Sequence, residues 1–104
     1  GAPTAKQLSF RGLTLDLEQE EVFFDGKKVE LTATEYEMLR LLASNRSQIF
    51  SAQRLYEAIW DEPWYYGANN TVMVHIRNLR QKIEKDPKNP VFIKTAWGRG
   101  YHFE

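Results

Sequence analysis

Apolar and polar residues alternate over short stretches between residues 8 and 31. Leucines occupy every second position from Leu13 to Leu17, and Asp25-Gly26 is typical of a two-residue hairpin turn. Alternation with a period of two places one face of a strand against a core. The stretch therefore predicts three or four short antiparallel strands that form a small structural sheet.

Helical spacing of apolar residues replaces this alternation in the middle of the chain. Thr32 and Glu35 form a capping box, so a first helix should begin after Thr32 and end near Ser44. Ser51 can cap a second helix that reaches about Trp60. We expect seven residues of these helices to face inward: Tyr36, Leu39, Leu42, Ala43, Leu55, Ala58 and Ile59.

The third predicted helix, residues 70–85, has an apolar face and a polar face. Its apolar stripe consists of Val72, Ile76, Leu79 and Ile83. The opposite face includes Asn70, Thr71, Val74, Arg77, Asn78 and Gln81. This mixture suits base edges in a DNA major groove, because amides pair with adenine, guanidinium groups with guanine, and aliphatic groups with thymine methyls. The alternative is an ordinary solvated surface helix, which is the commoner case for a helix taken alone.

The C-terminal residues predict a β-hairpin. Residues 92–96 and 101–104 are β-prone, and in the connecting residues 97–100 Arg99 lies between two glycines, one on each side. A narrow hairpin with an arginine at its tip suits a DNA minor groove or a phosphate. The alternative is that the glycines only form the turn, while Trp97 packs on the sheet.

An aromatic loop, residues 61–69, separates the second and third predicted helices. It contains Trp64, Tyr65 and Tyr66. One interpretation is a surface that contacts a protein partner. The other is that Trp64 and one of the tyrosines fold back over the core. The sequence supports both equally.

Charge is distributed unevenly along the chain. The 104 residues carry no net charge, and 42% of them are hydrophobic, which suffices for one domain with a core. Residues 1–45 contain five basic and eight acidic side chains, whereas residues 70–104 contain seven basic and three acidic ones. This asymmetry indicates a local anionic partner for the C-terminal third.

Composition argues against catalysis and against a membrane. The chain has no cysteine, and its two histidines, His75 and His102, lack metal-ligand spacing. A phosphate-binding glycine loop and a nucleophile–base pair are missing as well, so we expect no enzyme, no metal and no cofactor. The chain shows neither an apolar run long enough to span a bilayer nor a secretory signal, and its lack of cysteine agrees with the cytoplasm. Residues 1–7 are expected to be a cloning scar or linker remnant, and the domain to span residues 8–104.

Three motifs resemble the DNA-binding domain of the OmpR/PhoB family of bacterial response regulators. They are L-T-A-T-E-Y-E-M-L-R-L-L at 31–42, T-V-M-V-H-I-R-N-L-R-Q-K-I at 71–83 and T-A-W-G-R-G-Y-H-F at 95–103. The resemblance covers nearly everything from Leu8 onward. It implies a winged helix-turn-helix with an N-terminal four-stranded antiparallel sheet, three helices and a C-terminal hairpin wing. It also implies a receiver domain that precedes Gly1 and is phosphorylated by a cognate histidine kinase.

The resemblance carries DNA contacts over to particular positions. On the third helix these are Thr71, Val74, His75, Arg77, Asn78 and Arg80, at positions that the family uses on bases and phosphates. The polar and basic side of the same helix adds Asn70, Gln81 and Lys82 to the predicted DNA contacts. In the wing, at the minor groove, they are Thr95, Trp97, Arg99 and Tyr101. The chain departs from the usual family residues at Asn70, Met73, Asn78 and Trp97. These departures concern base preference, and the W-G-x-G-Y wing is similar to that of VanR-type regulators.

The resemblance also implies how the domain would assemble. Two copies would bind head to tail on direct repeats about one helical turn apart, and the aromatic loop would meet RNA polymerase. The alternative function is a protein-interaction module that uses the loop 61–69 and the wing. Partners of the first function are promoter DNA, the polymerase and the kinase; neither function involves a membrane.

Overall fold

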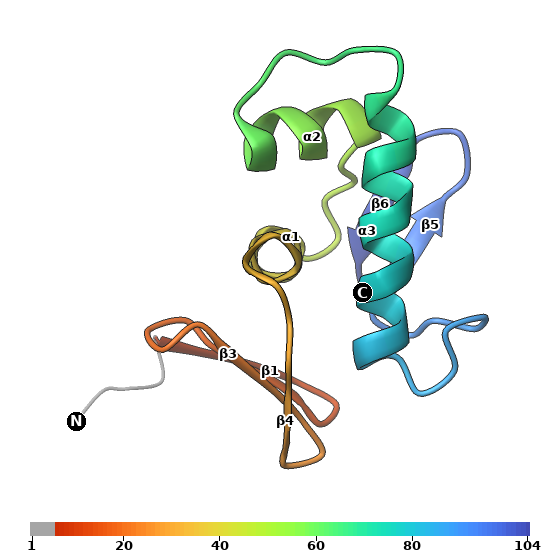
Figure 1. Cartoon of the computed structure of the whole chain (residues 1–104). Coiled ribbons are helices and arrows are strands. Elements are labelled where there is room, and N and C mark those ends of the chain that lie inside the picture. Colours follow the sequence, from red (N-terminus) through yellow and green to blue (C-terminus); the bar gives the residue numbers. More distant parts are fainter. Residues whose placement is uncertain (1–5) are drawn as a thin grey trace.

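The computed structural model describes residues 6–104 as a four-stranded antiparallel sheet, three helices and a C-terminal hairpin (Figure 1). The elements are β1 (Gln7–Phe10), β2 (Leu13–Asp16), β3 (Glu21–Phe24), β4 (Lys27–Val29), α1 (Ala33–Ser44), α2 (Ala52–Trp60), α3 (Ala68–Ile83), β5 (Ile93–Ala96) and β6 (Gly100–Phe103). The α+β fold expected from the sequence is confirmed. Strand β1 begins one residue before the expected domain start, and residues 1–5 of the expected scar lie outside the described residues.

The N-terminal sheet is a meander with the order β1-β2-β3-β4. Arg11-Gly12 and Asp25-Gly26 form its two-residue hairpin turns, and both residues of each pair have positive φ. Such turns match the twist of antiparallel strands, and glycine tolerates the conformation without steric cost. The alternation predicted from the leucines is present, because Leu13 and Leu15 are buried.

This sheet packs on the rest of the domain through aromatic contacts as well as through α1 (Figure 1). The ring centroids of Phe10 and Phe103 lie 4.8 Å apart, and those of Phe24 and Phe92 lie 6.0 Å apart. Each pair meets edge to face, an arrangement that stabilises aromatic contacts beyond their buried area. The sheet thus closes one end of the core against residues at the base of the C-terminal hairpin.

Helices α1 and α2 begin and end where the sequence predicts. The capping box of α1 is complete: the Thr32 hydroxyl accepts a hydrogen bond from the Glu35 amide, and the Glu35 carboxylate accepts one from the Thr32 amide. The Ser51 hydroxyl caps α2 by accepting from the amide of Arg54. These bonds satisfy amides that a helix start otherwise leaves unpaired.

One inward position was predicted incorrectly. Ala58 of α2 is exposed, whereas Tyr56 is buried beside Leu55. The helix has turned its larger side chains inward, because an aromatic ring gains far more from burial than a methyl group. The ring of Trp60 then stacks on the ring of Tyr56, with centroids 5.1 Å apart.

Helix α3 occupies Ala68–Ile83 instead of the expected residues 70–85. Its end is set by Glu84, which has extended backbone dihedrals and a buried carboxylate. That carboxylate accepts hydrogen bonds from the amides of Val91 at 2.8 Å, Phe92 at 3.1 Å and Ile93 at 2.8 Å. The helix ends there because the Glu84 carboxylate binds the amides of residues 91–93 instead of continuing the helix. These contacts are distant in sequence, so the periodicity of apolar residues in α3 does not predict them. Among the helices of residues 6–104, none is long and apolar enough to cross a membrane.

The wing sheet has a third participant that the sequence pattern did not predict. Phe50, in the connection between α1 and α2, forms an antiparallel bridge with Tyr101 of β6. The amide of Phe50 donates to the Tyr101 carbonyl at 2.8 Å, and the amide of Tyr101 donates to the Phe50 carbonyl at 2.9 Å. The wing is therefore joined directly to the helix-turn-helix.

Gly100 is the residue that permits this contact. Its φ is +139°, and a Cβ added there would lie 2.0 Å from the Phe50 carbonyl oxygen. Gly98 also has a positive φ, +78°, but an added Cβ would meet none of the described atoms within 4 Å. We therefore expect Gly100→Ala to lower the free energy of unfolding by about 3 kcal/mol, from strain and a backbone clash. Gly98→Ala, which carries only the strain, should cost about 1 kcal/mol. Urea denaturation of both variants measures the difference, and equal losses would contradict the close approach.

Candidate nucleic-acid interface

Five of the predicted DNA contacts form one exposed strip along α3. They are Asn70, Val74, Arg77, Asn78 and Gln81, all exposed. At about 100° per residue these positions fall within an arc of roughly 100°. The apolar stripe on the opposite side is buried as predicted. The strip thus presents amides, a guanidinium group and a small aliphatic group together on the outer face of a rigid helix.

A second group of predicted contacts faces α1 and α2. His75 Nδ1 lies 2.8 Å from the Thr71 carbonyl oxygen, and its ring meets the ring of Trp60 edge to face with centroids 5.0 Å apart. Lys82 Nζ lies 2.6 Å from Oε1 of the buried Glu35. His75 and Lys82 therefore make intramolecular contacts at the edge of the exposed strip.

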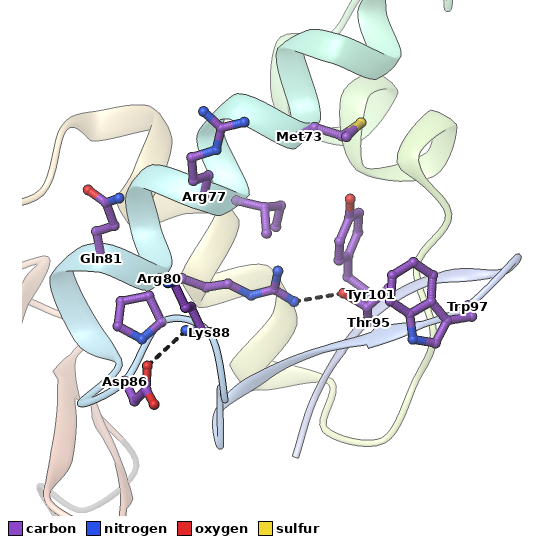
Figure 2. A pocket seen from close by; sticks show the side chains of 11 residues that line it. Met73, Arg77, Arg80, Gln81, Asp86, Lys88, Thr95, Trp97 and Tyr101 are labelled. Atoms are coloured by element: carbon purple, nitrogen blue, oxygen red, sulfur yellow. Dashed lines mark hydrogen bonds between the residues drawn. The ribbon is translucent and has the colours of Figure 1, made fainter.

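Arg80 is directed toward the wing (Figure 2). Its Nε donates to the carbonyl oxygen of Ile93 at 3.0 Å, and its Nη2 donates to Oγ1 of Thr95 at 2.9 Å. The guanidinium carbon also lies 5.8 Å from the ring centroid of Tyr101. Burial lowers the pKa of this guanidinium from its ordinary value, while Tyr101 and Glu84 act in the opposite direction.

The tip of the wing is open to solvent. Trp97 is 89% exposed, which rules out the alternative in which it packs on the sheet. Arg99 is exposed as well, and its amide donates to the Ala96 carbonyl at 2.8 Å to close the turn. Both side chains of the tip are therefore available to a partner, although a single exposed tryptophan does not by itself mark a contact site.

A groove of about 760 Å³ runs between α3 and the wing (Figure 2). Its lining residues are Met73, Ile76, Arg77, Arg80, Gln81, Asp86, Pro87, Lys88, Thr95, Trp97 and Tyr101. A neighbouring hollow shares several of these residues and adds Lys94. Cationic side chains from α3, the following loop and β5 therefore line these two adjoining hollows, an arrangement that suits a phosphate backbone.

Two of these cations were missed by reasoning from the sequence. Lys88 lies in the loop after α3, and Lys94 lies on β5. No motif marks them, since a lysine between two prolines or on a short strand resembles any solvated lysine. Only the course of the loop, which the Glu84 carboxylate directs back toward β5, brings Lys88 to the groove and Lys94 to the neighbouring hollow.

The aromatic loop divides between its two interpretations. Trp64 is half-buried and meets the ring of Tyr56 edge to face at 5.9 Å, so it covers the core. Tyr65 also contacts Tyr56, with centroids 5.8 Å apart, although it is 52% exposed. Tyr66 is 100% exposed. Within this loop, therefore, Tyr66 is the aromatic residue most available to a partner.

The fold and this surface define a winged-helix domain of the nucleic-acid-binding class: an exposed polar helix, a hairpin wing and a basic groove between them. A family model described as "Transcriptional regulatory protein, C terminal" matches residues 26–103. The RstA DNA-binding domain of Klebsiella pneumoniae, solved in complex with the RstA box, superposes with a TM-score of 0.85 at 33% identity, covering 94% of this chain and 96% of that one. DrrB of Thermotoga maritima, an OmpR/PhoB homolog, gives 0.86 at 35% identity, covering 94% and 44%.

Curated relatives agree with these structures. The uncharacterized transcriptional regulatory protein YrkP of Bacillus subtilis (strain 168) is 54% identical over 91 residues, 88% of this chain and 39% of YrkP. The regulatory protein VanR of Enterococcus faecium is 39% identical over 93 residues, 89% of this chain and 40% of VanR. The chain belongs to the family of C-terminal effector domains of OmpR/PhoB-type response regulators. It spans about two fifths of the length of the curated relatives named here.

The Glu35–Lys82 pair generates a prediction about acid stability. Burial acts to raise the pKa of Glu35, but the hydrogen bonds from Lys82 and Thr32 outweigh it and hold the pKa below its ordinary value. A lowered folded-state pKa means that the pair stabilises the fold fully above the unfolded pKa of about 4.3, and that this stability is lost as the pH falls through the folded pKa. Glu35→Gln should therefore cost about 1–2 kcal/mol at pH 7 and less at pH 3.

Thermal unfolding of Glu35→Gln and wild type across this pH range measures the effect. Glu37→Gln is the matched control, because it removes a half-buried carboxylate, paired with Arg40 at 2.8 Å, from the same helix turn, whereas the Glu35 carboxylate is buried. If both variants show the same pH dependence, the buried pair is not the origin of the acid sensitivity.

Proposed function

We propose that this domain binds specific sequences of double-stranded DNA, with α3 in the major groove and the wing residues 97–100 at the adjacent minor groove. The observation that carries the proposal is the exposed strip of α3, which lies beside the basic groove. Arg77 and Gln81 belong to both surfaces, so a duplex whose phosphate backbone lies along the groove would meet base-reading groups and phosphate-binding groups together. The RstA DNA-binding domain, which has the same fold, was solved in complex with the RstA box, and this supports DNA binding by the present domain.

Different residues of the strip suit different bases. Amides at Asn70, Asn78 and Gln81 suit adenine, and Arg77 suits guanine. Val74 is 39% exposed between them and can meet a thymine methyl. Sites that contain A·T pairs flanked by a guanine are therefore the expected targets.

Assembly on promoters follows from the same proposal. Two copies would bind head to tail on direct repeats about one helical turn apart. A receiver domain phosphorylated by a histidine kinase would promote this dimer by raising the effective concentration of the second copy. A regulator bound to promoters in this way works in the bacterial cytoplasm, where we place the protein.

Substitutions at the two arginines test the proposal. Arg77→Ala should weaken binding to a duplex selected from a random pool by about 1–3 kcal/mol and relax specificity at one base pair. Arg99→Ala should weaken binding to all sequences alike and reduce the slope of log affinity against log salt by about one. Titration of labelled selected and scrambled duplexes at two salt concentrations measures both effects.

Lys27→Ala is the matched control for these titrations, since it removes an exposed cation from β4 in the N-terminal sheet. Its affinity and salt slope should equal those of wild type. Equal affinities of wild type, Arg77→Ala and Arg99→Ala for the selected duplex would overturn the assignment of both residues.

A second function, contact with RNA polymerase through the aromatic loop, is supported by the exposure of Tyr66. In the full-length regulator, Tyr66→Ala should keep DNA affinity and stability but lose most activation of transcription in a reconstituted promoter assay. Trp64→Ala should instead destabilise the domain by about 1–3 kcal/mol, because its ring covers the core. Full activation by Tyr66→Ala would exclude this residue from the polymerase contact.

A further inference from the structure

Arg80 connects two elements that the proposed function requires to act together. Its guanidinium group leaves α3 and reaches β5 at two points, the Ile93 carbonyl and the Thr95 hydroxyl, at 3.0 and 2.9 Å. It also lies near the face of the Tyr101 ring on β6. A planar guanidinium group with its donors in a fixed fork is well suited to hold such a geometry.

Of the two strands of the wing, β5 depends more than β6 on the contact with Arg80. Strand β6 is held by β5 on one edge and by the Phe50 bridge on the other. Strand β5 is the outer strand of the sheet, and the Arg80 side chain bonds to it across the floor of the groove (Figure 2). The distance between α3 and β5 sets the width of that groove.

We propose that Arg80 is a positioning residue, which fixes the wing relative to α3 so that the two DNA grooves are contacted at once. This inference rests on the proposed function and assigns Arg80 a role different from a direct base or phosphate contact. Two of its donors are committed to the wing, and its guanidinium is half-buried, unlike that of the exposed Arg77. We call these two hydrogen bonds, from Arg80 to Ile93 and Thr95, the bracket. Loss of the bracket would leave the surfaces of α3 and the wing intact but would misalign them.

Thr95→Val and Arg80→Lys test the bracket without changing net charge. The valine keeps the branched shape and loses the hydroxyl acceptor, whereas the lysine keeps the cation and loses the fork. For the measurement of wing motion in the free protein, Arg77→Lys is the matched control, because it makes the same chemical change at an exposed position one turn away on α3. Thermal unfolding first establishes that each variant is folded; should Arg80→Lys fail, Thr95→Val carries the test.

Two measurements test whether Arg80 positions the wing. In the free protein, ¹⁵N relaxation of residues 97–100 should show increased motion in Thr95→Val and Arg80→Lys but not in Arg77→Lys. On a selected duplex, each of the two bracket variants should lower affinity by about tenfold, with the salt slope unchanged. The double variant should bind about as well as the weaker single one, because both substitutions break the same bracket.

Losses that multiply in the double variant would show that Thr95 and Arg80 contact DNA independently, and would overturn the proposal. Wild-type affinity in Thr95→Val, combined with a salt slope reduced by about one in Arg80→Gln, would do the same and make Arg80 a phosphate contact. Should wild type show no preference for any duplex, the proposed function fails. The relaxation measurement on the free protein would still confirm or overturn the bracket.

Discussion

The close approach of Gly100 to the Phe50 carbonyl is the constraint on which the rest of the interface depends. It allows the connection between α1 and α2 to pair with β6, so the wing and the helix-turn-helix share backbone hydrogen bonds. Backbone pairing of this kind is short-ranged and directional, so it holds β6 to the helical core, while Arg80 bonds to the outer strand β5. The wing is therefore an extension of the helical core, and its tip projects at a defined place beside α3 (Figure 1).

Two buried carboxylates then fix α3 within this frame. Glu35 joins the start of α1 to Lys82 near the end of α3, and Glu84 ties the end of α3 to the beginning of β5. A carboxylate at a helix C-terminus is unfavourable for the helix dipole, but the three amides that Glu84 receives offset that cost. Both acids are buried and bonded internally, so neither carboxylate lies on the outer face of α3, where Arg77 is exposed.

Local signals predicted most of the fold, whereas long-range contacts decided the roles of individual site residues. The capping residues Thr32 and Ser51 marked their helices correctly, because capping involves only neighbours in sequence. The end of α3 was misplaced by two residues, since Glu84 acts on amides seven to nine positions away. Arg80 and Lys82 lie two residues apart on α3, yet one bonds to the wing and the other to α1. Periodicity places both on the polar side but does not contain their partners.

The central claim, that α3 and the wing read two adjacent grooves of one duplex, is tested most directly by methylation interference with dimethyl sulfate on a selected site. This reagent marks guanine N7 in the major groove and adenine N3 in the minor groove. The account predicts interference at guanines under α3 and at adenines in the flanking minor groove, both repeated about one helical turn further along. Interference confined to one groove would contradict simultaneous reading, and a uniform pattern without any interference would contradict specific binding altogether.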